Sequence, residues 1–290
     1  MIYILLAIFT STSIALMFKF FEGKNIDSFQ TIVFNYYACI ALGFFNTEVS
    51  ISPVSVIGQT WFPFACLIGT LYIVTFYLIA ETIKKSGITV ATVANKLSMI
   101  IPAITAFFIY QNESLSLFKA TGIIVAIIAV VLTSIKEKNE TDIIENKKFL
   151  LLPFILWMLA GISDTVIGYV ENSMLTPQLF PTFLASLFSI ACILGTILFL
   201  YNLITKKITF KFKNLLGGIA LGIPNYYSAE FFMKALTYSG LDKSVLFPVI
   251  SIGIVVLSSL GAYFIFKEHL STKNVFGIAL AIFAIVLMNA

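Results

Sequence analysis

The sequence predicts an all-α integral membrane protein with ten transmembrane helices, arranged as two inverted five-helix repeats. Three observations lead to this prediction: the apolar composition, the long apolar segments and a motif that occurs twice. Of the 290 residues, 59% are hydrophobic and 11% are charged. A soluble domain carries about 25% charged residues. Most of the surface of this protein is therefore expected to face lipid.

Apolar segments of membrane-spanning length follow one another along the whole chain. A helix needs about 20 predominantly apolar residues to cross a hydrocarbon core of about 30 Å. The predicted spans, numbered 1 to 10, are 2–19, 29–47, 62–83, 88–110, 117–135, 149–170, 180–204, 214–236, 243–266 and 272–289. These spans leave no room for a soluble domain.

A short motif near the end of each half indicates an internal repeat. The sequence ESLS at 113–116, followed by Gly122, recurs 155 positions later as EHLS at 268–271, followed by Gly277. Over 22 aligned positions from the start of each motif, ten residues are identical. Internal repeats in a membrane protein are typical of transporters, with the binding site between the halves.

A weaker match at an offset of 153 extends the repeat toward the N-terminus. It aligns three residues of the first half with three of the second: Gly69, Ser86 and Gly87 with Gly222, Ser239 and Gly240. The repeats are therefore placed at 1–135 and 149–290, joined by a polar cytoplasmic linker at 136–148. Since each repeat has five spans, the second copy enters the membrane from the opposite side, which predicts a pseudo-two-fold axis in the membrane plane.

The lysines predict the orientation, because all 18 basic residues are Lys. Fourteen lie in the connections after spans 1, 3, 5, 7 and 9, whereas the opposite side holds Lys119 and Lys243. Cytoplasmic loops carry the excess of positive charge. We therefore expect an inner (cytoplasmic) membrane protein with both termini outside the cytoplasm. The net charge of +4 requires no nucleic-acid partner, because the lysines are spread over five short loops.

The repeated Glu-x-Leu-Ser turn, each time followed by a glycine-containing apolar helix, resembles the EamA-type branch of the drug/metabolite transporter superfamily. The resemblance covers essentially the whole chain. The first half departs from the pattern at 81–87 (ETIKKSG), where the second half has the more typical KALTYSG at 234–240. The resemblance implies that spans 1, 3, 4, 6, 8 and 9 line a central cavity and that spans 5 and 10 pack at the periphery. Members move small metabolites, amino acids, nucleotide sugars or drugs.

Three charged residues lie more than four residues from either end of a predicted span: Lys96 in span 4, Asp164 in span 6 and Glu230 in span 8. A charge at the bilayer centre costs about 2.5–3.5 kcal/mol on insertion scales and is usually paired and functional. We expect Lys96 to face Asp164 or Glu230, with a substrate or a proton disturbing the pair. The alternative is a structural ion pair. Glu230 and Lys234 are one helical turn apart and are expected to form a local pair.

Uncharged polar residues complete the predicted substrate or coupling site. Gly222, Pro224 and Asn225 either interrupt span 8 and free backbone carbonyls for a ligand, or form a simple proline kink. Asn225 aligns with Tyr72 at the offset of 153, which places the two across the cavity from each other. The full predicted set is Lys96, Asp164, Glu230, Asn95, Asn225, Tyr72 and Tyr226.

The predicted function is secondary active transport of small metabolites by alternating access, with efflux by proton antiport favoured. A substrate exchanger or a facilitative uptake carrier is the alternative, and a channel or a non-transport membrane scaffold is the different class. No nucleophile–base or metal-ligand motif is present, so no enzyme, catalytic residue, metal or cofactor is expected. The expected partners are a small-molecule substrate, the lipid bilayer and protons. A monomer and a homodimer both fit the sequence.

Overall fold

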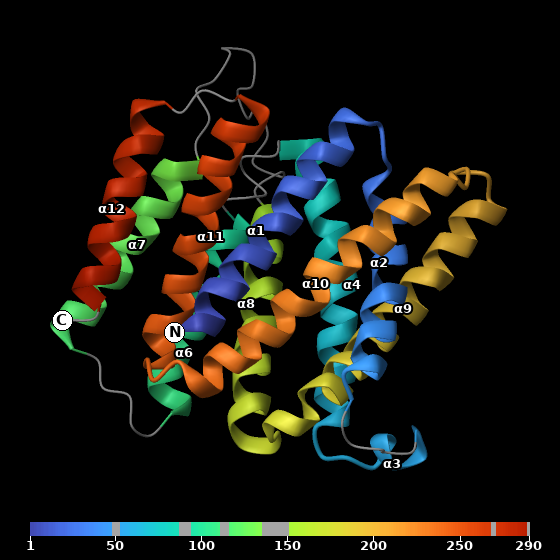
Figure 1. Ribbon diagram of the computed structural model, residues 1–290, viewed down its shortest axis with the longest axis horizontal. Coiled ribbons are helices and arrows are strands. Elements are labelled where there is room, and N and C mark those ends of the chain that lie inside the picture. Colours follow the sequence, from blue (N-terminus) through green and yellow to red (C-terminus); the bar gives the residue numbers. More distant parts are fainter. Residues whose placement is uncertain (48–52, 87–93, 111–115, 135–150, 268–270, 289–290) are drawn as a thin grey trace. The chain divides into compact units, whose positions relative to one another are not determined.

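The computed structural model describes residues 1–47, 53–86, 94–110, 116–134, 151–267 and 271–288, and in these ranges the chain is helical and contains no β-strand (Figure 1). Six helices are long and apolar enough to cross a membrane, and three further apolar helices are shorter. Large apolar side chains stand exposed on them, for example Phe45 and Phe108. These are the properties of a multi-pass membrane protein.

The described helices overlap the segments predicted from hydropathy, but among the described residues six helices, not ten, are candidate spans. The labelled elements are α1 (Ile2–Gly23), α2 (Ser28–Phe45), α3 (Pro53–Ile57), α4 (Phe62–Ser86), α6 (Ile100–Ile109), α7 (Leu117–Ser134), α8 (Leu151–Met174), η2 (Pro177–Leu179), α9 (Phe180–Ile204), α10 (Phe212–Tyr238), α11 (Lys243–Phe266) and α12 (Thr272–Met288). The six candidate spans are α1, α2, α9, α11, α8 and the Phe62–Ile79 part of α4. The long helix α10 carries several polar residues and is in neither apolar group.

The chain packs as two compact units. Unit 1 comprises Met1–Tyr77 and Val166–Ser239, and unit 2 comprises Leu78–Thr165 and Gly240–Ala290. Each unit therefore takes one segment from each predicted repeat, and α4 and α8 pass from one unit into the other. The two units are defined by their internal contacts and not by sequence similarity. They therefore do not test the repeat boundaries, and the repeats at 1–135 and 149–290 remain a prediction. The predicted linker lies outside the described residues.

In unit 1, α2 packs against α9 and α10, and α1 packs against α10. Glycines allow the α2–α9 approach. A Cβ atom at Gly43 would lie 2.8 Å from the Cβ of Ala185, and one at Gly195 would lie 3.3 Å from a methyl group of Val33. The two contacts are related by one shift in sequence number. Gly195 lies 152 positions after Gly43, and Ala185 lies 152 positions after Val33.

A second pair of glycines in unit 1 makes closer contacts of the same kind. A Cβ atom at Gly69 of α4 would lie 2.4 Å from the carbonyl oxygen of Leu187 in α9. A Cβ atom at Gly222 of α10 would lie 2.6 Å from the carbonyl oxygen of Asn35 in α2. Both glycines are therefore required for helices to touch backbone to backbone.

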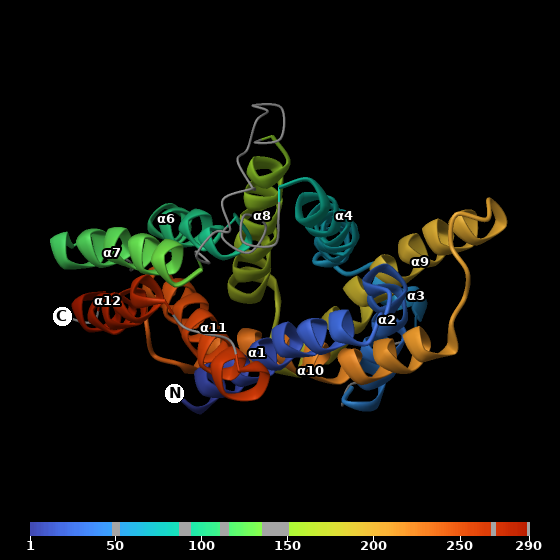
Figure 2. The same ribbon diagram turned by 90° about the horizontal axis from the view of Figure 1, so that it is seen from above.

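In unit 2, α7 and α12 lie side by side (Figure 2). Small residues allow transmembrane helices to approach closely. The buried small residues of this interface recur at the repeat offset of 155: Gly122, Ala126 and Ala129 on α7, and Gly277, Ala281 and Ala284 on α12. The last helix of one predicted repeat thus packs against the last helix of the other.

The serine of the repeated motif has the same role at both sites. Ser116 precedes α7, and its Oγ accepts a hydrogen bond from the backbone N–H of Lys119 at 3.1 Å. Ser271 precedes α12, and its Oγ accepts from the N–H of Asn274 at 3.3 Å. Each serine therefore caps the N-terminus of its helix. The preceding residues of both motifs, 113–115 and 268–270, lie outside the described residues.

Candidate functional site

The helix that carries Lys96 is interrupted directly after it. Residues 94–97 are helical, Ser98 and Met99 form a turn, and α6 begins at Ile100. Pro102 has no N–H group, so it cannot donate the helical hydrogen bond to the carbonyl of Ser98. That carbonyl instead accepts a shorter-range bond from the N–H of Ile101 at 3.0 Å. The proline thus accounts for a break in a predicted span.

Side chains satisfy the backbone groups at the break. The indole Nε1–H of Trp157 on α8 donates to the carbonyl of Leu97 at 3.0 Å. The hydroxyl of Ser98 donates to the carbonyl of Asn95 at 2.6 Å. Non-helical backbone at membrane depth is tolerated where the protein supplies such partners. Asn95, a predicted site residue, is half-buried and contributes its carbonyl to this arrangement.

The N-terminal part of α8 packs along this interrupted segment with a constant register. Contacts recur every four residues on both segments: Leu97 with Trp157, Ile101 with Gly161 and Thr105 with Thr165. Since both numbers increase together, the two segments run in the same direction, as the prediction requires of spans 4 and 6. In this register Asp164 is level with residue 104. The position level with it is therefore eight residues beyond Lys96, on the other side of the break at Ser98 and Met99.

Lys96 and Asp164 are both half-buried in unit 2, and their charges interact. No hydrogen bond or ion pair joins the two side chains in the described part of the chain. A direct structural ion pair, the alternative to a functional site, is therefore not formed in this conformation. Two opposite charges staggered along one pair of helices can each engage a different group of one ligand.

We expect Trp157→Phe to lower the free energy of unfolding by about 1–3 kcal/mol, because the carbonyl of the half-buried Leu97 would lose its hydrogen-bond partner. Thermal unfolding in detergent measures this loss. Trp61→Phe is the matched control, since the Nε1 of Trp61 is buried without a hydrogen-bond partner among the described residues. Equal losses in the two variants would show that the Trp157–Leu97 bond contributes nothing.

Glu230 lies in unit 1, on α10, and is 5% exposed. Its Oε1 accepts a hydrogen bond from the Nζ of Lys234 at 2.5 Å, which is the predicted local pair. Tyr226, fully buried one turn earlier, interacts electrostatically with Glu230. Neither the Tyr226 hydroxyl nor the second carboxylate oxygen of Glu230 has a hydrogen bond in the described part of the chain. Lys234 also lies 5.9 Å from the centre of the ring of Tyr3.

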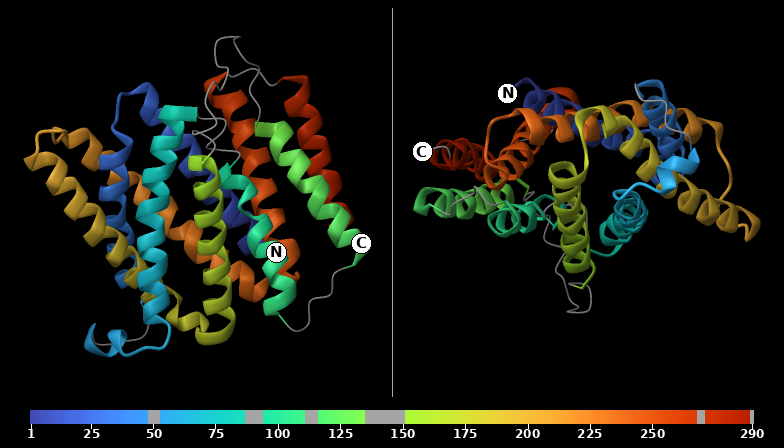
Figure 3. Two further views of the ribbon diagram at one scale, coloured as in Figure 1. Left: turned by 180° about the vertical axis from the view of Figure 1, so that it is seen from behind. Right: turned by 90° about the horizontal axis from the view of Figure 1, so that it is seen from below.

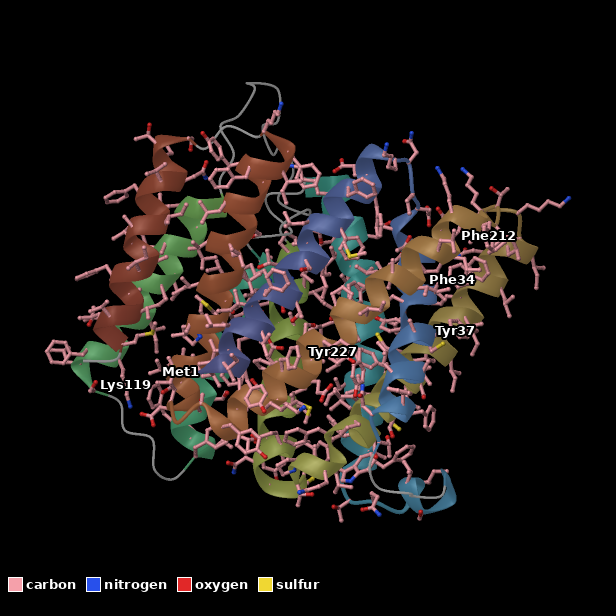
Figure 4. All side chains as sticks on the ribbon, viewed as in Figure 1. Met1, Phe34, Tyr37, Lys119, Phe212 and Tyr227 are labelled. Carbon is pink, nitrogen blue, oxygen red and sulfur yellow. The ribbon has the colours of Figure 1, made fainter. Side chains whose placement is uncertain are left out.

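Aromatic rings surround this charged pair. Tyr227, labelled in Figure 4, stacks on Phe231 with 5.6 Å between ring centroids. Phe231 in turn stacks on Tyr3 at 6.4 Å. The Glu230–Lys234 pair is thus held between α1 and α10, in surroundings of low polarity.

Asn225 packs against α2, where its Nδ2 donates to the Oδ1 of the fully buried Asn35 at 2.6 Å. Tyr72 lies against Phe188 of α9, with ring centroids 6.2 Å apart. Of the predicted residues, Lys96, Asn95 and Asp164 therefore belong to unit 2. The others, Glu230, Asn225, Tyr72 and Tyr226, belong to unit 1.

The suggestion that Gly222, Pro224 and Asn225 interrupt span 8 is wrong, because α10 is continuous from Phe212 to Tyr238 with Pro224 inside it. A proline removes one N–H, and the close packing of Gly222 on α2 holds the remaining turns in helical geometry. The interruption occurs instead in span 4, at Ser98 and Met99.

Sequence reasoning missed Glu171, which is 6% exposed in the part of α8 that belongs to unit 1. Its Oε1 accepts a hydrogen bond from the hydroxyl of Thr237 on α10 at 2.6 Å. The signal was present, because Glu171 follows Asp164 by seven residues and therefore lies two turns further along the same helix face. Asn35 was also excluded, since span 2 was not expected to line the cavity.

No cluster of three or more His, Cys, Asp or Glu side chains that could hold a metal ion occurs in the described ranges. No protein-family model matches the chain. An uncharacterized protein of Haemophilus influenzae is 27% identical over 286 residues, which cover 97% of this chain and 95% of that protein. A solved structure, described as "Crystal structure of protein", superposes with a TM-score of 0.73 at 14% identity, over 99% of this chain and 94% of that one. The chain therefore shares its fold, over nearly its whole length, with a protein of known structure.

Proposed function

We propose that the protein is a secondary transporter of small metabolites that works by alternating access, as in the EamA-type branch of the drug/metabolite transporter superfamily. The observation that carries the proposal is the placement of Lys96 and Asp164. These opposite charges lie on apolar helices, beside an interrupted helix, without a direct ion pair. Charges of this kind in membrane helices usually belong to substrate or ion pathways, and broken helices are typical of transporter binding sites.

The matched glycine contacts of unit 1 support the proposed inverted repeat of ten spans. In an interface between two equivalent copies, a contact from residue i to residue j is repeated from the equivalent of i to the equivalent of j. Gly43 with Ala185 and Gly195 with Val33 satisfy this relation at an offset of 152, one residue from the offset of 153 found in the sequence. We place the lysine-rich connections in the cytoplasm and both termini outside it.

In the proposed cycle, Asp164 binds and releases a proton, and Lys96 binds an anionic group of the cargo. Ionised Asp164 binds the cationic group of a zwitterionic cargo. Protonation of Asp164 removes the negative charge that attracts this group, so cargo binding weakens. Proton and cargo therefore exclude each other at the site, which is what antiport requires. Efflux follows when a proton that enters from the outside displaces cargo that was bound from the cytoplasm.

The experiment that tests the proposal is thermal stabilisation of the purified protein by a metabolite library at two pH values. A ligand that binds the folded state alone stabilises it by about 2.7 kcal/mol at a hundredfold excess over its Kd. We expect a hit among anionic or zwitterionic metabolites. If no compound stabilises the protein at either pH, a metabolite site at Lys96 and Asp164 is contradicted.

Lys96→Met should weaken binding of such a ligand about tenfold or more, because a hydrogen bond to a charged group contributes about 1.5–3 kcal/mol. Titration of the ligand against the purified variant measures the effect. Lys96→Arg, which keeps the charge, should retain most of the affinity, and Lys234→Met in unit 1 is the control for loss of a different half-buried lysine. Unchanged affinity in Lys96→Met would assign Lys96 a structural role.

A further inference from the structure

The α1–α2 turn and the α9–α10 hairpin lie at the same end of unit 1 (Figure 3). Residues of both line a polar cavity of about 280 Å³. Its volume exceeds that of several water molecules at about 30 Å³ each. The residues that give it chemical character are Asp27, Gln30, Lys206, Lys207, Lys211 and Asn214. None of them belongs to the candidate transport site.

The cavity is built by buried side chains that tie two helix starts together. Gln30, which is 3% exposed, donates from Nε2 to the carbonyl of Thr209 at 2.9 Å, and its Oε1 accepts from the N–H of Lys211. The N–H of Asp27 donates to the Oδ1 of Asn214 at 3.1 Å. The start of α2 and the start of α10 are therefore fixed relative to each other within unit 1.

The lining favours an anion. Three lysines of its lining, Lys206, Lys207 and Lys211, outnumber the one acidic residue, Asp27, with its single carboxylate. That carboxylate already accepts the N–H of Gln30 at 2.9 Å as the N-cap of α2. The potential inside the cavity is therefore positive on balance.

One hydrogen-bond donor of a lining residue also lacks a partner in the described part of the chain. Asn214 is fully buried, and its Nδ2 has no hydrogen bond in the described part of the chain. The cavity lies at the N-terminus of α10, where the side chain of Lys211 makes no cap. The first N–H groups of a helix have no partner within the helix, and such ends bind phosphate and other anions.

We propose that this cavity binds a phosphate group, with the headgroup of an anionic phospholipid as its principal source. Exposed apolar side chains stand beside it, at Ile204 before the hairpin and Phe212 after it, and these can contact acyl chains. Figure 4 labels Phe212 at this end of α10. Basic pockets at the membrane surface are suited to phospholipid headgroups. A soluble organic phosphate shares the same chemistry and is the other source.

Native mass spectrometry of the full-length protein tests the proposal with phosphatidylglycerol and phosphatidylcholine of identical acyl chains. Wild-type protein should retain phosphatidylglycerol at least about tenfold better. The combined Lys206→Gln, Lys207→Gln and Lys211→Gln variant should lose this preference, and Asn214→Leu should weaken it. The control variant removes three lysines elsewhere on the lysine-rich side of the chain: Lys19→Gln, Lys267→Gln and Lys273→Gln.

Loss of the preference in the cavity variant but not in the control supports a phosphate site. Competition by soluble glycerol phosphate would then identify a free metabolite as the source, and its absence would identify the lipid. An unchanged preference in the cavity variant, or an equal loss in the control, overturns the proposal. The assay involves no transport, so its outcome is independent of the proposed function.

Discussion

Asp164→Asn is expected to abolish transport driven by a pH gradient and to leave the protein folded. Asparagine has nearly the same shape as aspartate, but it cannot bind and release a proton. Because Asp164 makes no ion pair or hydrogen bond that an amide would break in the described part of the chain, the packing of α8 should survive the change. Flux into liposomes under an imposed pH gradient measures the loss, and thermal unfolding checks that the variant is folded.

Two buried carboxylates in unit 1 are the alternative candidates for the proton-binding group, and the same assay tests them. Glu171→Gln and Glu230→Gln remove the corresponding charge from α8 and α10 in unit 1. We expect both variants to keep gradient-driven transport. If Asp164→Asn transports at the wild-type rate while one of these variants does not, the coupling group lies in unit 1 and the proposed role of Asp164 is wrong.

Gly69→Ala and Gly222→Ala are expected to destabilise the protein by similar amounts, each by about 1–3 kcal/mol, as is usual for overpacked cores. The new methyl groups would lie 2.4 Å from the carbonyl oxygen of Leu187 and 2.6 Å from that of Asn35. Both obstacles are backbone atoms, so a side-chain rotation cannot relieve the clash. Whole helices would have to move apart.

Thermal unfolding in detergent measures these two losses. Gly23→Ala is the matched control, because no atom lies within 4 Å of a methyl group built at Gly23. If Gly222→Ala unfolds at the same temperature as Gly23→Ala, α2 and α10 are not in backbone contact. A large loss at one glycine alone would argue against equivalent packing of the two halves.

The sequence predicted an all-helical protein with apolar helices of membrane-spanning length, because the length and apolarity of a membrane helix are local properties. It also identified Gly69 and Gly222 as matched positions and Ser116 and Ser271 as part of a motif. It could not assign their roles. Whether a glycine faces a carbonyl of another helix depends on how the two helices cross. Hydropathy gives no information on helix crossing.

Two prolines with the same local effect on the backbone have different structural outcomes. Pro102 and Pro224 both remove one backbone N–H from a predicted span, yet the helix breaks near Pro102 and continues through Pro224. The difference lies in tertiary partners. The indole of Trp157 satisfies a carbonyl at the break, whereas Gly222 packs α10 tightly onto α2. A single sequence does not reveal either partner.

The charged residues of the candidate site could be identified from the sequence. Which of them lie close to one another could not. Lys96, Asp164 and Glu230 stand out because charges are rare in apolar spans. Which unit each residue joins depends on how α4 and α8 pass from one unit to the other. Glu171 was missed because it lies near the end of α8, where a charge is usually taken to be interfacial.

The most direct test of the central claim is ligand flux in liposomes that contain only the purified wild-type protein. The cargo would be a metabolite that stabilises the protein in the thermal assay, and a pH gradient would supply the driving force. We expect saturable, uphill movement of this ligand that stops when the pH gradient is collapsed. Flux no faster than in protein-free liposomes would contradict transport, and unsaturable downhill flux that ignores the gradient would indicate a channel.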